Sequence, residues 1–303
     1  MKYFVKQFIL GKTAILPIEA SHFALLQKSQ RSMVAAKAIE EKYDLMISNY
    51  LEFEKELLLQ ITEQVVLNKE SYDDFYQIST ILNRRIVNLL TSTKLYYDQM
   101  QRQVRLCDFN NDNFSNTALN YFSREYDNHF EYRFMENLRN YVQHCGLAIH
   151  SFSLPSNWEG EGDSRLMKNG IKIYSTREEL GQDPKFSKRP VFSECTDKIN
   201  LTKSIRKYIE KLSLIHSEIR ALIEENLKES RNCIENVISE YKAVNDNNAL
   251  GIYAYSVDSD DPLGDVETKV PLLLDWDNVR LNLINKNKGI TNNSKRYISG
   301  DCL

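Results

Sequence analysis

Hydrophobic residues recur every three or four positions over much of the chain, the spacing of amphipathic helices. Segment 34–67 contains no Gly or Pro and is rich in Ala, Glu, Leu and Lys, all good helix formers. A second helix is predicted over 71–107, where Ser71 and Asp74 provide a start signal. Segment 197–244 repeats the same apolar spacing without interruption and predicts a third long helix.

Segment 130–149 predicts the helix that carries the candidate chemistry. Asn128 and Glu131 have the spacing of a capping box at its start, and Gly146 offers an early end. One face of this helix is apolar and is expected to be buried: Phe130, Phe134, Leu138, Tyr141, Cys145 and Ile149. The opposite face is polar: Arg133, Glu136, Asn137, Asn140 and His144.

The remaining segments predict smaller mixed units. Residues 1–33 form an N-terminal segment with a strand that we expect Pro17 to end. Segment 151–196 carries most of the Gly and Pro and predicts an insertion with a hairpin or irregular loops. Residues 251–303 form a small C-terminal unit that opens with a strand.

The predicted fold is mainly α, an up-and-down bundle of four long helices over 34–250 with a small mixed α/β insertion and a C-terminal unit. Helix content should be well above half.

Composition limits the function classes. The chain has 303 residues, 42% of them hydrophobic, which suffices to bury a core, and its net charge of −3 excludes a broadly basic nucleic-acid coat. Any contact with RNA must therefore come from a local patch. No apolar run approaches a membrane span, and lysines interrupt the N-terminus in a way that does not suit a signal peptide. A cytoplasmic protein without a membrane partner is expected.

Metal and cofactor sites are not predicted. The five Cys are scattered, with no C-x-x-C pair, which argues against structural zinc or a disulfide framework. Gly11-Lys12-Thr13 lacks the earlier Gly of a phosphate-binding loop, and 258–262 lacks the closing Glu of a calcium loop. Turn chemistry also explains 158–163 better than a metal loop. We expect neither metal nor cofactor.

Three polar residues of segment 130–149 have the properties that RNA cleavage needs. RNA supplies its own 2′-hydroxyl nucleophile, so a nuclease requires proton transfer and a fixed cation for the phosphate. His144 suits proton transfer and Arg139 suits a bidentate phosphate clamp, while Asn140, one turn before His144, can position the ring or the phosphate. Arg139 and His144 point about 140° apart on a regular helix. Either Arg139 reaches around the helix or a second chain completes the site.

Other polar residues are candidate supports. Asp98 is expected to orient Arg139 if the two helices pack side by side. Further residues are expected to hold phosphates or support the site: Arg84, Arg102, Arg133 and Glu136.

The string Arg139-Asn140-x3-His144 on a helical background resembles the HEPN superfamily, whose nuclease members carry an Arg followed after four to six residues by a His. The preceding segment 83–92 resembles the helix before that motif in bacterial HEPN proteins, and the likeness covers about 71–149. The resemblance implies a metal-independent endoribonuclease in which these residues have the same roles. It also implies a homodimer with both motifs at its interface, 2′,3′-cyclic phosphate products, and a toxin or antiphage role with an antitoxin or other regulatory protein as partner.

A second hypothesis stays open. A HEPN-like helical module could bind RNA or a protein without cutting, with Arg139 only bridging Glu136 and His144 serving as a packing residue.

Overall fold

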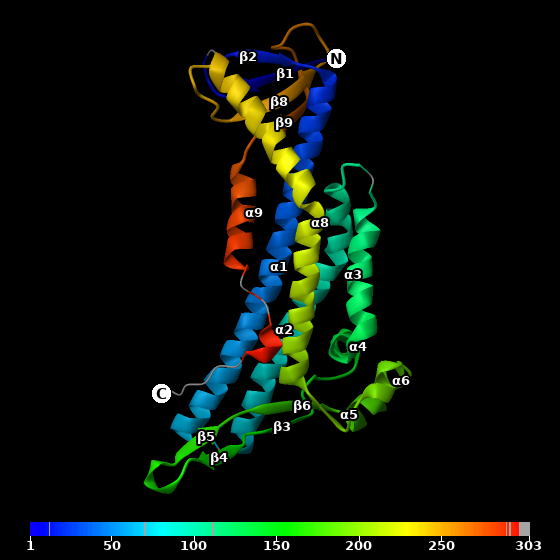
Figure 1. The fold of residues 1–303 in the computed structure, drawn as a ribbon, viewed down its shortest axis with the longest axis vertical. Coiled ribbons are helices and arrows are strands. Elements are labelled where there is room, and N and C mark those ends of the chain that lie inside the picture. The colour runs from blue at the N-terminus through cyan, green and yellow to red at the C-terminus, as the bar shows by residue number, and fades with distance from the viewer. Residues whose placement is uncertain (12, 70, 111, 289, 291, 297–303) are drawn as a thin grey trace. The chain divides into compact units, whose positions relative to one another are not determined.

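The computed structural model describes residues 1–11, 13–69, 71–110, 112–288, 290 and 292–296 (Figure 1). It is 65% helical, so the prediction of a mainly α protein is confirmed. The longest of the described helices are α1 (Ala20–Leu67), α2 (Tyr72–Leu106) and α8 (Leu201–Val244), with 48, 35 and 44 residues.

The chain divides into two compact units, each built from discontinuous segments. One comprises 1–41, 99–119 and 217–288, and we call it the sheet unit. The other comprises 42–98 and 120–216 with the described residues after 288, and we call it the motif unit because it contains Arg139 and His144.

A four-stranded antiparallel sheet gives the sheet unit its name. Its strands, in spatial order, are β2 (Ile15–Ile18), β1 (Lys2–Gln7), β8 (Ile252–Val257) and β9 (Val266–Pro271). The register pairs Val5 with Ala254 and Ala254 with Val270, and these three side chains belong to one buried cluster. Phe23 of α1 and Val237 of α8 belong to the same cluster, so one face of the sheet packs against these two helices.

Two predictions for the first 33 residues are wrong. Pro17 does not end a strand but lies within β2, where the edge position tolerates a residue without a backbone N–H. Helix α1 begins at Ala20, well before the predicted start at Val34. Its early turns carry Phe23 and Leu26 into the cluster beneath the sheet, and this long-range packing stabilises the added helix.

Short elements surround the helices. The motif unit contains a three-stranded sheet in the order β3-β6-β7 and a separate hairpin of β4 and β5. The bounds of its strands are Ser151–Ser153 (β3), Ser156–Glu159 (β4), Leu166–Asn169 (β5), Lys172–Thr176 (β6) and Lys198–Asn200 (β7). The remaining helices are α3 (Phe114–Asn128), α4 (Phe130–His144), α5 (Arg177–Gln182), α6 (Pro184–Ser187), α7 (Val191–Glu194) and α9 (Asp275–Lys286), with 3₁₀ turns at Gly162–Ser164 and Asn293–Lys295.

Aromatic contacts hold the helices of the motif unit together. Tyr132 of α4 meets Tyr208 of α8 edge to face at 5.0 Å between ring centroids. The ring of His216 stacks on Tyr43 of α1 at 3.7 Å, and its Nδ1 lies 2.9 Å from the hydroxyl of Tyr96 on α2. All five side chains are buried, so the first pair attaches α4 to α8 and the others hold α8 against α1 and α2 within this unit.

Of the two predicted capping boxes, the one at the start of α2 is present and the one at the start of α4 is not. At α2, the backbone N–H of Asp74 donates to Ser71 Oγ at 3.1 Å and that of Ser71 donates to Asp74 Oδ2 at 3.0 Å, so the capping box is confirmed. At α4 the prediction is wrong, because Asn128 is the last residue of α3 and its Nδ2 donates to Arg124 O. His129 precedes α4 instead, with no side-chain cap.

Boundaries elsewhere also changed. The motif helix α4 has only 15 residues, so it is not a fourth long helix. Residues 198–200, predicted as helix, form strand β7 and leave α8 to start at Leu201. The hairpin predicted in the insertion is present as β4 and β5, and the strand predicted after Leu250 is β8.

Candidate active site

Helix α4 ends at His144 because Gly146 permits a close approach to Tyr141. The backbone N–H groups of Cys145 and Gly146 both donate to Tyr141 O, at 2.8 and 3.3 Å. A Cβ on Gly146 would lie only 2.8 Å from the Tyr141 hydroxyl, so a glycine fits here without displacing the ring. His144 is therefore the last helical residue, and its side chain is exposed.

Asn83 of α2 anchors the segment that follows His144. Its Oδ1 accepts hydrogen bonds from the backbone N–H groups of Ala148 and Ile149, both at 3.0 Å. The side chain is buried and its Nδ2 donates to Ser79 O. Asn83 lies in the segment that resembles HEPN proteins, and no local sequence signal indicated this anchoring role.

His150 is a structural residue beside this anchor. Its Nδ1 accepts from the backbone N–H of Thr176 at 3.1 Å, so its Nε2 carries the proton that is donated to Leu147 O at 2.8 Å. Burial lowers the pKa of His150 and favours this neutral form.

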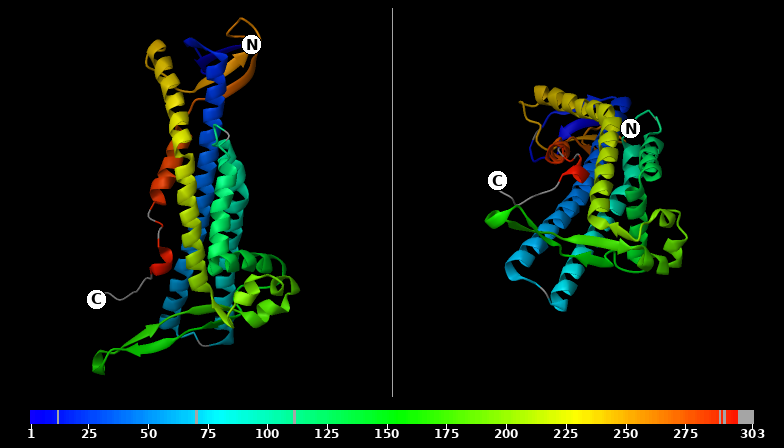
Figure 2. Two further views of the ribbon diagram at one scale, coloured as in Figure 1. Left: turned by 45° about the vertical axis from the view of Figure 1, so that its right-hand side comes forward. Right: turned by 60° about the horizontal axis from the view of Figure 1, so that its bottom comes forward.

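His144 and Asn140 line one cavity of about 320 Å³, which we call the motif pocket. The short helices after β6 lie beside α4 (Figure 2), and α6 with the residues flanking it contributes the opposite wall. The lining residues are Asn137, Asn140, Tyr141, His144, Cys145, Asp183, Lys185, Phe186 and Arg189. Phe186 packs edge to face on Tyr141, with ring centroids 5.9 Å apart, which attaches α6 to the motif helix.

The motif pocket has a cationic edge. Lys185 and Arg189 are exposed, and neither makes an ion pair with a carboxylate among the residues described. Asp183 is occupied as the cap of α6, where its carboxylate accepts from the backbone N–H groups of Lys185 and Phe186. The bond from the Lys185 backbone is the main reason that the pKa of Asp183 is lowered. The charge of Lys185 also helps to lower this pKa, so the edge of the pocket holds two cations and one carboxylate.

Arg139 faces a second cavity of about 380 Å³, which we call the aromatic pocket. It is lined by Lys94, Tyr97, Phe122, Ser123, Tyr126, Asp127, Tyr132, Glu136 and Arg139. The Arg139 side chain is only 10% exposed. Its Nη2 donates to Asn140 Oδ1 at 3.0 Å, and its Nη1 lies 3.5 Å from Glu136 Oε2.

Arg139 and His144 thus line different cavities of one chain, as their divergence on the helix predicted. Asn140 connects the two, because it accepts from Arg139 and lines the motif pocket beside His144. Asn137, expected on the polar face, is buried and donates to Arg133 O.

The supporting residues are spread out. Asp98 pairs with Lys94 and not with Arg139, so it does not orient the guanidinium. Arg133 forms an ion pair with Glu194 of α7, with Nη2 2.6 Å from Oε2, and also donates to the Tyr126 and Asp127 carbonyls.

Glu136 accepts from the Tyr208 hydroxyl beside Arg139. Arg84 is exposed on α2 and lines neither pocket, while Arg102 belongs to the sheet unit.

Sequence reasoning missed Lys185 and Arg189. Both lie in the segment predicted as an insertion, and no periodicity there indicated which element it would pack against. Their signal was only a run of basic residues, Lys185, Lys188 and Arg189, which is more often a solvated surface.

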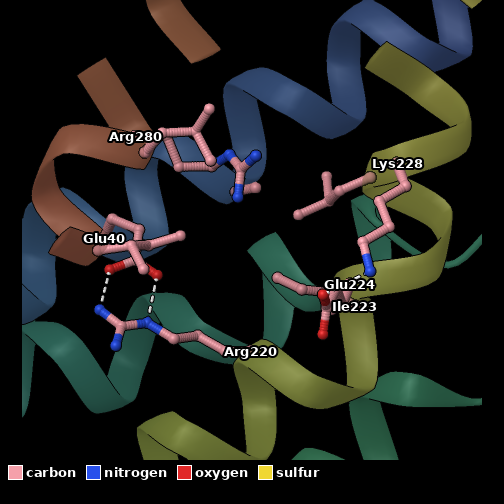
Figure 3. Close-up of a pocket in the computed structure, with 10 residues that line it drawn as sticks. Glu40, Arg220, Ile223, Glu224, Lys228 and Arg280 are labelled. Carbon is pink, nitrogen blue, oxygen red and sulfur yellow. Dashed lines mark hydrogen bonds and ion pairs between the residues drawn. The ribbon is translucent and has the colours of Figure 1, made fainter. Parts of the chain in front are cut away.

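A third cavity, of about 340 Å³, lies within the sheet unit between α1, α8 and α9 (Figure 3). Its carboxylates already have cationic partners. Glu40 accepts two hydrogen bonds from Arg220, at 2.8 and 2.6 Å, and Glu224 pairs with Lys228 at 2.6 Å. It contains none of the residues predicted for the active site.

Within the described part of the chain, no group of three or more His, Cys, Asp or Glu side chains is placed to hold a metal ion. No described helix combines the length and apolar character needed to cross a membrane. Neither a protein-family model, nor a curated protein, nor a solved structure matches the chain. The candidate site therefore rests on the residues and geometry of this chain.

Proposed function

We propose that this chain is a metal-independent endoribonuclease of the HEPN type, built on a HEPN-like helical bundle. The observation that carries the proposal is the motif pocket, where exposed His144 lies with Asn140 opposite the cations Lys185 and Arg189. A proton-transfer group next to an unpaired cationic edge is the combination that cleavage of a phosphodiester needs.

The reaction would use the ribose of the RNA as nucleophile. The 2′-oxygen attacks the adjacent phosphorus, its proton passes to a base, and the bond from phosphorus to the 5′-oxygen breaks. The leaving 5′-oxygen takes up a proton from His144 or from water, whichever of the two did not accept the 2′ proton, and the products carry a 2′,3′-cyclic phosphate and a 5′-hydroxyl. His144 is the proton-transfer group, and Asn140 positions its ring or the phosphate. Lys185 and Arg189 hold the substrate anion.

A homodimer would bring Arg139 into the reaction. Within one chain Arg139 and His144 line separate cavities, so a phosphate beside His144 receives its Arg139 from a facing copy of α4. The protein should then be dimeric at micromolar concentration in sedimentation. A monomer that cuts RNA would overturn the composite site. A role as a toxin or antiphage effector held by an antitoxin or regulatory protein follows only from the family resemblance.

One observation favours a second candidate, a HEPN-like module that binds RNA or a protein without cutting. Arg139 is buried and its charge already lies against Glu136, with a further hydrogen bond to Asn140. This is the contact expected of an arginine with a structural role.

Cleavage and binding of a single-stranded RNA oligonucleotide separate the two candidates. His144→Ala should slow cutting by about 10²- to 10⁴-fold and leave the dissociation constant nearly unchanged. Replacing both Lys185 and Arg189 with Ala should weaken binding and cutting together. His22→Ala, in the sheet unit, is the control histidine variant and should match wild type.

Three further results decide the mechanism. An RNA with a single 2′-deoxyribose at the cleaved position should resist cutting, because it lacks the nucleophile. Activity should survive EDTA, and activity that EDTA removes and zinc or manganese restores would refute a metal-independent reaction. If wild type binds RNA and does not cut it, or if His144→Ala cuts as fast as wild type, the nuclease proposal is wrong.

A further inference from the structure

The aromatic pocket is separate from the motif pocket within one chain, and Arg139 is the one lining residue that the proposed cleavage chemistry uses. Its lining residues come from α2, α3 and α4, and all of them belong to the motif unit. Its volume of about 380 Å³ is within the range of small-molecule sites and exceeds that of a single flat heterocycle.

Aromatic rings form the outer walls of this pocket. Tyr97 meets Phe122 edge to face, with centroids 5.0 Å apart and an interplanar angle of 89°. Tyr97 and Tyr126 are 36% and 38% exposed. Rings that stay accessible next to a cavity are suited to stack on a flat ligand.

Arg139 supplies unmet hydrogen-bond donors to the same cavity. The residue is 9% exposed, and its Nε is buried without a hydrogen-bond partner among the described residues. Its Nη1 also makes no hydrogen bond, although it lies 3.5 Å from Glu136 Oε2. Leaving charged donors unsatisfied in the interior costs free energy, which an acceptor oxygen or nitrogen on an entering ligand would recover.

The charges of the pocket favour a neutral ligand over a free anion. Two cationic side chains, Lys94 and Arg139, line it together with two carboxylates, Asp127 and Glu136. Carboxylates would repel a phosphate placed among them, whereas a heterocycle with both donor and acceptor edges can use both kinds of group. The Lys94 ammonium also lies 5.1 Å from the centroid of Tyr97 and makes a cation–π interaction with that ring.

We infer that the aromatic pocket receives an unpaired nucleobase of single-stranded RNA. The base stacks on Tyr97 or Tyr126, and Arg139 donates to its acceptor edge. This inference rests on the proposed function for the identity of the polymer. It adds a base-binding step that positions the strand, separate from proton transfer at His144.

Binding measurements on the full-length His144→Ala protein test this step without interference from cleavage. Adenosine and guanosine 5′-monophosphate should bind, and ribose 5-phosphate, which lacks the base, should bind at least about 10-fold more weakly. In the same background, at least one of Tyr97→Ala and Tyr126→Ala should weaken binding of a labelled single-stranded RNA about 5- to 100-fold. Tyr97→Phe keeps the ring and should retain affinity.

Tyr76→Ala is the matched control, because Tyr76 is an exposed tyrosine of α2 in the same unit that does not line the pocket. Thermal melts establish that every variant is folded at the temperature of the binding assay.

The inference is overturned if both alanine variants bind RNA like the parent, or if ribose 5-phosphate binds as tightly as the nucleotides. If wild-type protein binds RNA through Tyr97 and Tyr126 without cutting it, the nuclease proposal is refuted and the nucleobase site in the aromatic pocket is retained. Wild-type cutting with unchanged binding in both variants would refute the pocket alone.

Discussion

Replacing Asn83 with Ala should loosen the segment that follows the motif helix. Asn83 Oδ1 is the common acceptor for the backbone N–H groups of Ala148 and Ile149, each at 3.0 Å. Asn83, Ala148 and Ile149 are 2%, 0% and 6% exposed, so water does not readily replace the lost oxygen. The variant leaves two buried donors without a partner.

The magnitude follows from the number of unmet bonds. Each buried, unsatisfied donor costs about 1 to 3 kcal/mol, so the pair should lower the free energy of unfolding by about 2 to 6 kcal/mol. At the lower limit, opening of this segment becomes about 30-fold more favourable. The amides of Ala148 and Ile149 should then exchange with solvent faster by at least this factor if local opening controls their exchange.

Hydrogen exchange read by mass spectrometry on peptides covering 145–152 measures the local effect, and urea unfolding followed by circular dichroism measures the global one. Asn88→Ala is the control, because Asn88 is an exposed asparagine on the same helix. Asn88→Ala should leave the free energy of unfolding within about 0.5 kcal/mol of wild type and should not change hydrogen exchange over 145–152. An Asn83→Ala protein that also stays within that range, with unchanged exchange over 145–152, would refute the anchoring role.

Three further outcomes are expected. Leu138→Ala should lower the free energy of unfolding by about 2 to 5 kcal/mol, because the side chain is 0% exposed, and a urea midpoint equal to wild type would exclude it from the core. Gly146→Ala should lower the free energy of unfolding by about 1 kcal/mol or more in the same assay, because the new Cβ would lie 2.8 Å from the hydroxyl of the buried Tyr141 ring. An unchanged urea midpoint would show that the Tyr141 side chain moves aside without a loss of stability. The folded-state pKa of His150 is lowered, so the unfolded chain takes up a proton more readily, and the free energy of unfolding should fall as the pH drops below about 6.5. This decline should be smaller in His150→Asn, and an equal decline in both proteins would assign the pH dependence to other groups.

Local sequence signals were sufficient where the interacting groups are close in the chain. Ser71 and Asp74 are three residues apart and form their capping box as predicted. The end of α1 at Leu67, the span of α8 to Val244 and strand β8 also follow local patterns of apolar residues and turn residues. Asn128 and Glu131 have an equally good capping signal, yet α3 continues through Asn128 and removes it from that role.

The sequence by itself determined that the protein is mainly α and that Arg139, Asn140 and His144 share one helix, because helical periodicity is a property of neighbouring residues. It also determined that Arg139 and His144 diverge, since their angle depends only on helix geometry. Only the tertiary structure decided that Arg139 is buried beside Glu136 in the aromatic pocket, while His144 is exposed in a different one. It also brought Lys185 and Arg189 to the motif pocket. The environment of a side chain depends on which distant elements pack against its helix, and the spacing of nearby residues does not determine that packing.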